Sequence, residues 1–276
     1  KASKITDLLR VNPGSRFRLK DHRTDWREAK ALRDLSNDEL KEKSRAYVER
    51  NLESLAQAQE LLYASDIYSV LIIFQAMDAA GKDGMIKHVM SGLNPQGCQV
   101  FSFKKPSDED LDHIFLWRYS KRLPERGRIG IFNRSYYEET LIVRVHPELL
   151  EKQKLPPKLV TKRIWKERFQ DIRGFERYLG RNGIVVRKFF LHVSKEEQKR
   201  RFLDRLNEPE KHWKFAAADV AERAHWDEYQ QAYEETIQHT ATPHAPWFVI
   251  PADHKWYTRL AVAAAIVDAL AELKLE

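Results

Sequence analysis

Apolar residues along the chain fall into short dense runs, separated by longer segments in which they recur with helical spacing. The short runs are rich in β-branched and aromatic residues and predict five buried strands, at residues 68–74, 99–103, 128–132, 184–191 and 247–250. The longer segments predict helices at about 40–64, 82–92, 107–123, 136–150, 156–182, 195–206, 219–240 and 256–273. Because parallel neighbours need helical crossovers, this alternation predicts an α/β fold with a doubly wound, mostly parallel five-stranded sheet.

The N-terminal part does not share this rhythm. Residues 1–27 show no helical or strand period and are interpreted as an arm that lies over the surface. Ser36-Asn-Asp-Glu39 has the spacing of a capping box and begins a helix that runs to about Ala64. No linker interrupts the later strands. We therefore expect an arm and helix at 1–66, packed on an α/β core at 67–276 as a single structural unit.

Composition and charge narrow the function only slightly. The 276 residues include 48 Lys+Arg and 41 Asp+Glu, and the formal net charge of +7 favours anionic partners. Charged residues of both signs make up 32% of the chain, which also fits an ordinary solvated surface. Cys98 is the only cysteine, which excludes an internal disulfide, and we interpret it as a packing residue. No apolar run could cross a bilayer and the first residues lack a signal-peptide pattern, so a soluble, cytoplasmic protein is expected.

The segment after the first strand is typical of a phosphate-binding loop. Gln75-Ala-Met-Asp-Ala-Ala-Gly-Lys-Asp-Gly84 nearly matches G-x-x-x-x-G-K-[ST], in which backbone amides and a helix N-terminus hold phosphate. Ala76 replaces the first glycine of that pattern, and Asp83 replaces the Ser/Thr that would hold Mg²⁺. A polar turn tightened by one glycine is the alternative. The candidate phosphate-binding residues here are Ala79, Ala80, Gly81, Lys82, Asp83 and Gly84.

Asp78 distinguishes these two interpretations. A carboxylate inside a phosphate-binding loop would repel the phosphate. In a site that is partly shielded from water, this repulsion is on the order of several kcal/mol at short range. It is tolerable if a metal intervenes or if it orients the acceptor. Because the Ser/Thr metal ligand is missing, we predict that Asp78 is a Mg²⁺ ligand or holds a metal-bound water. A turn residue that points to solvent is the alternative.

A second polar segment follows the third strand, in Gly130-Ile-Phe-Asn-Arg-Ser-Tyr-Tyr-Glu-Glu139. Asn133 stands where a doubly wound kinase would carry a metal-binding Asp, and it offers only a carbonyl oxygen. Arg134 can bind phosphate oxygens in a bidentate way. Glu138 is a candidate second metal ligand near the acceptor, although helix N-termini favour glutamates regardless of function.

These motifs together resemble the polyphosphate kinase family 2, P-loop enzymes that move phosphoryl groups between inorganic polyphosphate and nucleotides. The resemblance covers about residues 71–260. Its anchors are Met-Asp-Ala-Ala-Gly-Lys-Asp-Gly (77–84), Ser-Gly-Leu-Asn-Pro-Gln-Gly (91–97), Phe-Leu-Trp-Arg-Tyr (115–119), Phe-Asn-Arg-Ser-Tyr-Tyr-Glu (132–138) and His-Trp-Lys-Phe (212–215). Asn133 in place of the more frequent Asp looks like the class III branch, which phosphorylates both AMP and ADP.

The resemblance implies a thymidylate-kinase-like P-loop domain at 67–276 with a helical lid at about 200–220. It places Asp78 in metal and phosphate chemistry and Lys82 on the transferred phosphoryl group, with Asn133, Arg134 and Glu138 as the other catalytic candidates. It further implies Mg²⁺, with Mn²⁺ as a substitute, and a homo-oligomer, either a dimer or a tetramer.

A polymeric anion requires a line of cations rather than one pocket. Such a line would attract polyphosphate by the same release of counterions that drives binding to the phosphates of nucleic acids. Each single Lys or Arg could equally be a solvated surface charge. The predicted track consists of Lys104, Lys105, Arg118, Arg122, Arg134, Arg187 and Lys188. The predicted lid residues, which would exclude water from the phosphates, are Arg201, Arg205, Trp213 and Lys214.

The sequence thus predicts a phosphotransferase that moves phosphoryl groups reversibly from polyphosphate to AMP and ADP. The nearest alternative is an ATP-dependent nucleoside or nucleotide kinase with a thymidylate-kinase-like fold. A basic nucleic-acid-binding protein is a second alternative, but no RNA- or DNA-reading motif is present and acidic residues interleave the basic ones.

Overall fold

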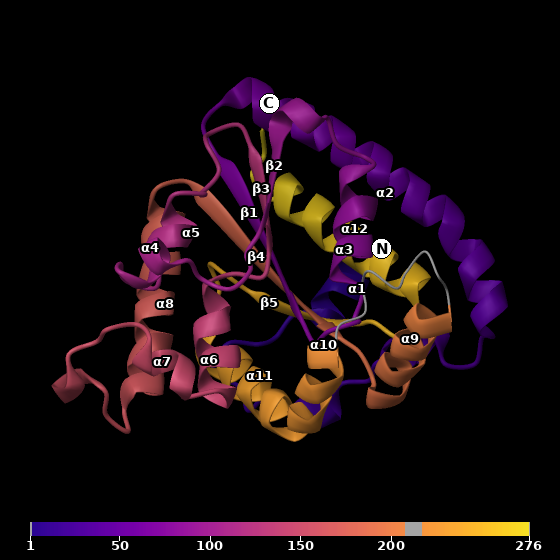
Figure 1. Cartoon of the computed structure of the whole chain (residues 1–276). Coiled ribbons are helices and arrows are strands. Elements are labelled where there is room, and N and C mark those ends of the chain that lie inside the picture. Colours follow the sequence, from indigo (N-terminus) through magenta and orange to yellow (C-terminus); the bar gives the residue numbers. More distant parts are fainter. Residues whose placement is uncertain (1, 208–216, 276) are drawn as a thin grey trace.

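The computed structural model describes residues 2–207 and 217–275, and its centre is a five-stranded parallel sheet (Figure 1). The strands are β1 Ser69–Ala76, β2 Cys98–Ser102, β3 Ile129–Asn133, β4 Ile184–His192 and β5 Trp247–Pro251. Their order across the sheet is β2-β3-β1-β4-β5, and every paired neighbour runs parallel. The predicted α/β fold with a doubly wound five-stranded sheet is confirmed, and each strand lies within a few residues of its predicted position.

β1 occupies the middle of the sheet because its sequence can be buried on both faces. All eight of its residues are buried, and β3 and β4 pair with its two sides. Phe74, Phe132 and Phe189 stand near its carboxyl end and are fully buried. The strand order reverses direction at β1, and ligands of open α/β sheets bind outside the carboxyl ends of the strands at that point.

Helices cover both faces of the sheet. α2, α3 and α12 pack together on one face, where α1 also contacts α12, whereas α6, α8 and α11 pack on the other (Figure 1). The helices are α1 Ala2–Leu9, α2 Asn37–Ser65, α3 Lys82–Met90, α4 Asp108–Leu111, α5 Trp117–Ser120, α6 Ile142–Val145, α7 Glu148–Glu151, α8 Ile164–Arg181, α9 Lys195–Asn207, α10 Ala217–Glu222, α11 Trp226–Thr240 and α12 Lys255–Ala271. Over the described ranges, none of them combines the length and the apolar character that a membrane span requires.

Four predicted elements differ from the structure. The single helix expected at 219–240 is divided into α10 and α11 by a 3₁₀ turn at Arg223–His225. The segment 1–27 contains α1, where Thr6 donates a hydrogen bond to Asp268 of α12, so tertiary packing stabilises a helix too short to form alone. The single helix expected at 107–123 is two one-turn helices, α4 and α5. Phe115 and Leu116 lie between them and turn into the core instead of continuing the helix.

The helix expected to begin at Pro156 starts later. Pro157–Leu159 form only a short 3₁₀ turn, and Val160 leaves the helical conformation with φ −84° and ψ 81°. α8 then begins at Ile164, which is buried in a small apolar cluster with Val143 and Leu150. Proline is favoured at the start of a helix. Here the prolines begin only a single 3₁₀ turn, which does not continue into α8.

Candidate active site

The loop after β1 turns directly into the N-terminus of α3. Gly81 caps the helix with φ +104°, a left-handed conformation that a residue with a side chain adopts at a cost. Ala79 is also left-handed, with φ +60°. The first N–H groups of an α-helix have no intrahelical acceptor, so the amides at the start of α3 can bind an anion. This geometry suits the phosphate binding that the spacing of residues 75–84 predicts.

Lys82 holds its amine inside this loop. Its Nζ donates to Ala76 O at 2.7 Å, and the side chain is buried. Burial and, to a smaller extent, the nearby Arg134 guanidinium lower the pKa of Lys82 to about 8, although the carboxylates of Asp78, Glu138 and Asp83 oppose this shift. Within the described residues the amine therefore has backbone carbonyls but no paired carboxylate, and a bound phosphate would restore its ordinary preference for the charged form.

β3 brings the second polar segment against this loop. Arg134 Nη2 donates to Asp78 Oδ1 at 3.1 Å, in an ion pair that is about one third exposed on both sides. The backbone of Arg134 has a left-handed conformation, with φ +65°, and its N–H donates to Phe74 O of the neighbouring β1. Non-glycine residues in this conformation are uncommon and concentrate at functional sites. The strained backbone points the guanidinium toward the loop.

The two other candidate metal ligands occupy different places. Asn133 Nδ2 donates to Asp83 Oδ1 at 2.8 Å, and both residues line the same cavity as Asp78. Glu138 Oε1 accepts from Gln75 Nε2 at 2.8 Å and is not among the residues that line this cavity. Asp78, Asp83 and Asn133 are thus brought together at one edge, whereas Glu138 lies behind Gln75.

A cavity of about 520 Å³ opens above the loop. Nearly all of the binding and catalytic candidates from the loop and its surroundings line this cavity: Asp78, Ala79, Ala80, Gly81, Lys82, Asp83, Gly84, Lys104, Asn133, Arg134, Arg201 and Arg205. Lys105 is exposed and does not line it. Five further polar residues line the cavity that the sequence did not indicate: Ser102, Asp204, Lys255, Thr258 and Arg259.

Lys255 and Arg259 could have been found. They stand four residues apart in the first turns of α12, directly after β5, so they share one helix face at the carboxyl edge of the sheet. The same reasoning that selected Lys82 after β1 applies to this strand-to-helix junction.

A smaller cavity of about 300 Å³ continues the first one through Ser102 and Phe103, which line both. Arg118 and Arg122 line it, as the predicted track requires. Arg118 lies 3.5 Å from Asp110 and over the ring of Phe103. Arg122 lies over Phe101. The two cavities together form a basic channel along the carboxyl ends of β1, β2 and β3.

The predicted track is corrected at Arg187 and Lys188. Lys188 is fully buried in the core and pairs with Glu176 at 2.7 Å, so it is not available to a ligand. Arg187 lies toward the amino end of β4, pairs with Glu272 at the end of α12, and lines a different cavity. The two residues follow each other in a strand and point to opposite faces, and neither reaches the carboxyl edge where Lys82 lies.

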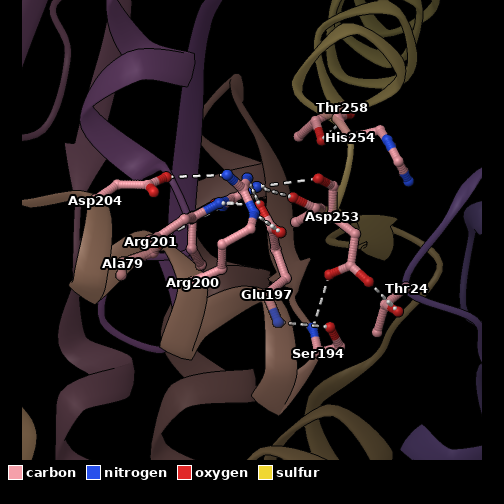
Figure 2. Close-up of polar contacts among 12 residues, drawn as sticks. Thr24, Ala79, Ser194, Glu197, Arg200, Arg201, Asp204, Asp253, His254 and Thr258 are labelled. Atoms are coloured by element: carbon pink, nitrogen blue, oxygen red, sulfur yellow. Dashed lines mark hydrogen bonds and ion pairs between the residues drawn. The ribbon is translucent and has the colours of Figure 1, made fainter.

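The predicted lid is corrected at Arg201. This residue lies in α9 and lines the cavity, but its guanidinium is buried and donates to backbone carbonyls of the loop (Figure 2). Arg205 lies one turn further along α9 and lines the cavity. Trp213 and Lys214 lie outside the described residues.

Comparison with known proteins shows the family of this chain. The sequence profile of the family Polyphosphate kinase 2 matches residues 37–276. An ADP-polyphosphate phosphotransferase of Rhodopseudomonas palustris is 53% identical over 238 residues, which cover 86% of this chain and 82% of that one. An AMP/ADP-polyphosphate phosphotransferase of Meiothermus ruber is 43% identical over 267 residues, which cover 97% and 93%.

A solved structure has the same fold over nearly the whole length. The crystal structure of Polyphosphate Kinase 2 from Arthrobacter aurescens superposes with a TM-score of 0.87 at 38% identity, and covers 99% of this chain and 90% of that one. The family resemblance that the motifs predicted is confirmed. The chain belongs to the polyphosphate kinase 2 family.

Proposed function

We propose that this protein transfers phosphoryl groups from inorganic polyphosphate to AMP and ADP, forming ADP and ATP, in a reversible reaction. The observation that carries the proposal is the basic channel that ends on Lys82 and the amides of α3, in a chain whose relatives are named as polyphosphate phosphotransferases. A channel suits a linear polyanion because each successive phosphate meets another cation. Cytoplasmic location and a homo-oligomeric state belong to the same proposal.

The reaction asks for alignment and charge neutralisation more than for covalent chemistry. The acceptor is a phosphate oxygen of the nucleotide, which is already ionised near neutral pH, so no general base is needed. A bond forms from this oxygen to the terminal phosphorus while the bridging P–O bond breaks and leaves its electron pair on the shortened polyphosphate. Lys82 and Arg134 would stabilise this developing negative charge.

The residues around Asp78 fit Mg²⁺. Asp78 and Asp83 supply two carboxylates and Asn133 an amide at one cavity edge, while the described residues contain no cluster of three His, Cys, Asp or Glu able to hold a metal by themselves. Mg²⁺ commonly binds through one or two carboxylates and completes its shell with substrate phosphates and water. Asp78, with Asn133 as a neutral neighbour, would hold Mg²⁺ or its substitute Mn²⁺, which would neutralise phosphate charge. Glu138 would act near the acceptor.

Acceptance of both AMP and ADP is the finer part of the proposal. The relative from Rhodopseudomonas palustris is named for ADP and the one from Meiothermus ruber for both nucleotides. The Asn133-Arg134-Ser135 sequence, which resembles the class III branch, supports the wider range.

A phosphate-balance assay tests the proposal. Purified protein with Mg²⁺ is given AMP or ADP as acceptor and either polyphosphate or ATP as donor, and the nucleotides are separated by ion-exchange chromatography. We expect ADP and ATP from AMP with polyphosphate, and loss of both after chelation of the metal with EDTA. Formation of ADP from AMP only when ATP is the donor would favour the nucleotide-kinase alternative, and ATP formed only from ADP would restrict the acceptor.

A further inference from the structure

Side chains of α9 bind three consecutive carbonyl groups of the phosphate-binding loop. Gln198 Nε2 donates to Asp78 O at 3.0 Å. Arg201 Nη1 donates to Ala79 O at 3.1 Å and to Ala80 O at 2.7 Å. Gln198 and Arg201 are three residues apart and share one helix face. One face of α9 therefore sets the orientation of three successive peptide groups in the loop.

Backbone carbonyls and one carboxylate accept hydrogen bonds from all the guanidinium nitrogens of Arg201. Its Nη2 donates to Ala252 O at 2.6 Å and to Asp253 O at 3.3 Å, in the connection from β5 to α12. Its Nε donates to Glu197 Oε1 at 2.7 Å. All three guanidinium nitrogens are engaged and the residue is only 8% exposed, so the planar group joins two backbone segments and leaves no donor directed at a ligand.

The carbonyl contacts determine where the loop amides point. In a trans peptide the C=O and N–H groups point in opposite directions, so a carbonyl turned toward α9 turns the next N–H away from it. Ala80 O is held by Arg201, and the N–H of Gly81 is therefore directed away from α9, next to the unpaired amides at the start of α3. The same contacts hold Ala79 in its left-handed conformation, which costs free energy and persists only where neighbours fix it.

α9 is itself anchored at its N-terminus. Asp253 Oδ1 accepts from the N–H of Ser194 at 2.8 Å, and Asp253 Oδ2 accepts from Thr24 Oγ1 at 2.6 Å (Figure 2). The backbone N–H of Asp253 also donates to Thr24 O. These hydrogen bonds connect α9 to the N-terminal arm and to the β5–α12 connection. The three segments together fix the position of α9 relative to the loop.

We infer that Arg201, assisted by Gln198, is a positioning residue that holds the loop with the Gly81 N–H turned toward the transferred phosphoryl group, while the Ala80 N–H donates to Met77 O within the loop. Arg201 acts through the Ala79 and Ala80 carbonyls, and Gln198 acts through the Asp78 carbonyl. The inference rests on the proposed function, because it assigns the loop to the phosphoryl donor. A lysine at position 201 would keep the charge but could not span both backbone segments.

The test compares Arg201→Lys with Arg200→Lys. Arg200 is the matched control: it precedes Arg201 in α9, is exposed, and within the described residues pairs with Glu197 and Asp204 of its own helix rather than with the loop. Transfer kinetics are measured for donor and acceptor separately, and binding of inorganic tripolyphosphate is measured by calorimetry without turnover. For Arg201→Lys we expect a fall in kcat on the order of 10²-fold, as for other small misplacements of binding groups, weaker tripolyphosphate binding and an unchanged KM for the nucleotide. Arg200→Lys should behave as wild type.

The outcomes separate the positioning role from its rivals. Wild-type kcat and tripolyphosphate affinity in Arg201→Lys would overturn the inference, because charge alone would then suffice. A lower kcat in proportion to a smaller folded fraction, with tripolyphosphate affinity unchanged, would show a merely structural role. If Arg201→Lys does not fold, Gln198→Met removes the donor to Asp78 O and should lower kcat and tripolyphosphate affinity in the same direction, and wild-type values for both would overturn the inference.

The result also separates the inference from the proposed function. Wild-type protein that binds tripolyphosphate without transferring phosphate would contradict the proposed reaction, and the difference between Arg201→Lys and Arg200→Lys in binding would still decide the positioning role. Wild-type protein that does neither would overturn both.

Discussion

Lys82 and Lys188 are two buried lysines whose surroundings differ in one respect. Lys188, in β4, donates to Glu176 Oε2 at 2.7 Å and to the Tyr137 hydroxyl and Thr240 O, both at 2.9 Å. Lys82, at the start of α3, donates to Ala76 O and lines a cavity, and no carboxylate in the described part of the chain pairs with it. Burial lowers the pKa of both amines; the Glu176 ion pair opposes this for Lys188, whereas carboxylates that are nearby but not paired oppose it for Lys82.

The difference shows how one residue type serves either folding or binding. A buried charge that is paired within the protein has its charge satisfied and stays in the core. Burying a charge that lacks a partner is unfavourable, and a bound anion offsets this cost.

Replacement of Lys82 should give the largest effect. It should lower the activity without lowering the stability of the fold. In Lys82→Met the transferred phosphoryl group loses its cation, and we expect phosphoryl transfer to fall on the order of 10³-fold. The thermal midpoint should stay the same or rise, since burying an unpaired amine is unfavourable. Initial rates and thermal unfolding are measured on the same preparation. Undiminished transfer by Lys82→Met would remove this residue from the reaction.

Lys188→Met should have the opposite profile. It leaves Glu176 buried without its partner, and we expect a loss of about 3–5 kcal/mol in the free energy of unfolding, measured with urea. Below its unfolding transition the variant should keep the wild-type kcat. The double variant with Glu176→Gln should recover much of the lost stability. If the single variant is as stable as wild type, the ion pair contributes nothing and the contrast between the two lysines fails.

The smallest effect concerns pH. Because Lys82 titrates near pH 8, its amine is charged below that pH and neutral above it, and kcat/KM for polyphosphate should fall about tenfold per unit above pH 8. A bound phosphate raises the pKa, so the fall in kcat should begin at higher pH. Lys82→Arg stays charged and serves as the control, with a lower rate but no decline in this range. A wild-type kcat/KM that stays level to pH 10 would contradict the prediction.

Strand positions were predictable because buried parallel strands are continuous apolar runs, and Val70–Phe74 is the clearest of them. The joint position of Lys82 and Arg134 was predictable for a related reason: both follow strands whose carboxyl ends meet at one edge. The two short turns α4 and α5 were not, because Phe115 and Leu116 follow the core rather than the local helical period.

The amino-acid sequence by itself determined the doubly wound sheet and the family, since these depend on local patterns and on motifs contiguous in the chain. Only the tertiary structure decided the partner of each basic residue. Arg187, Lys188 and Arg201 look like ligand-binding cations in the sequence, yet Glu272, Glu176 and the loop carbonyls bind them in the fold. Whether a charge faces the ligand cavity or is held inside the protein depends on contacts between segments far apart in the chain.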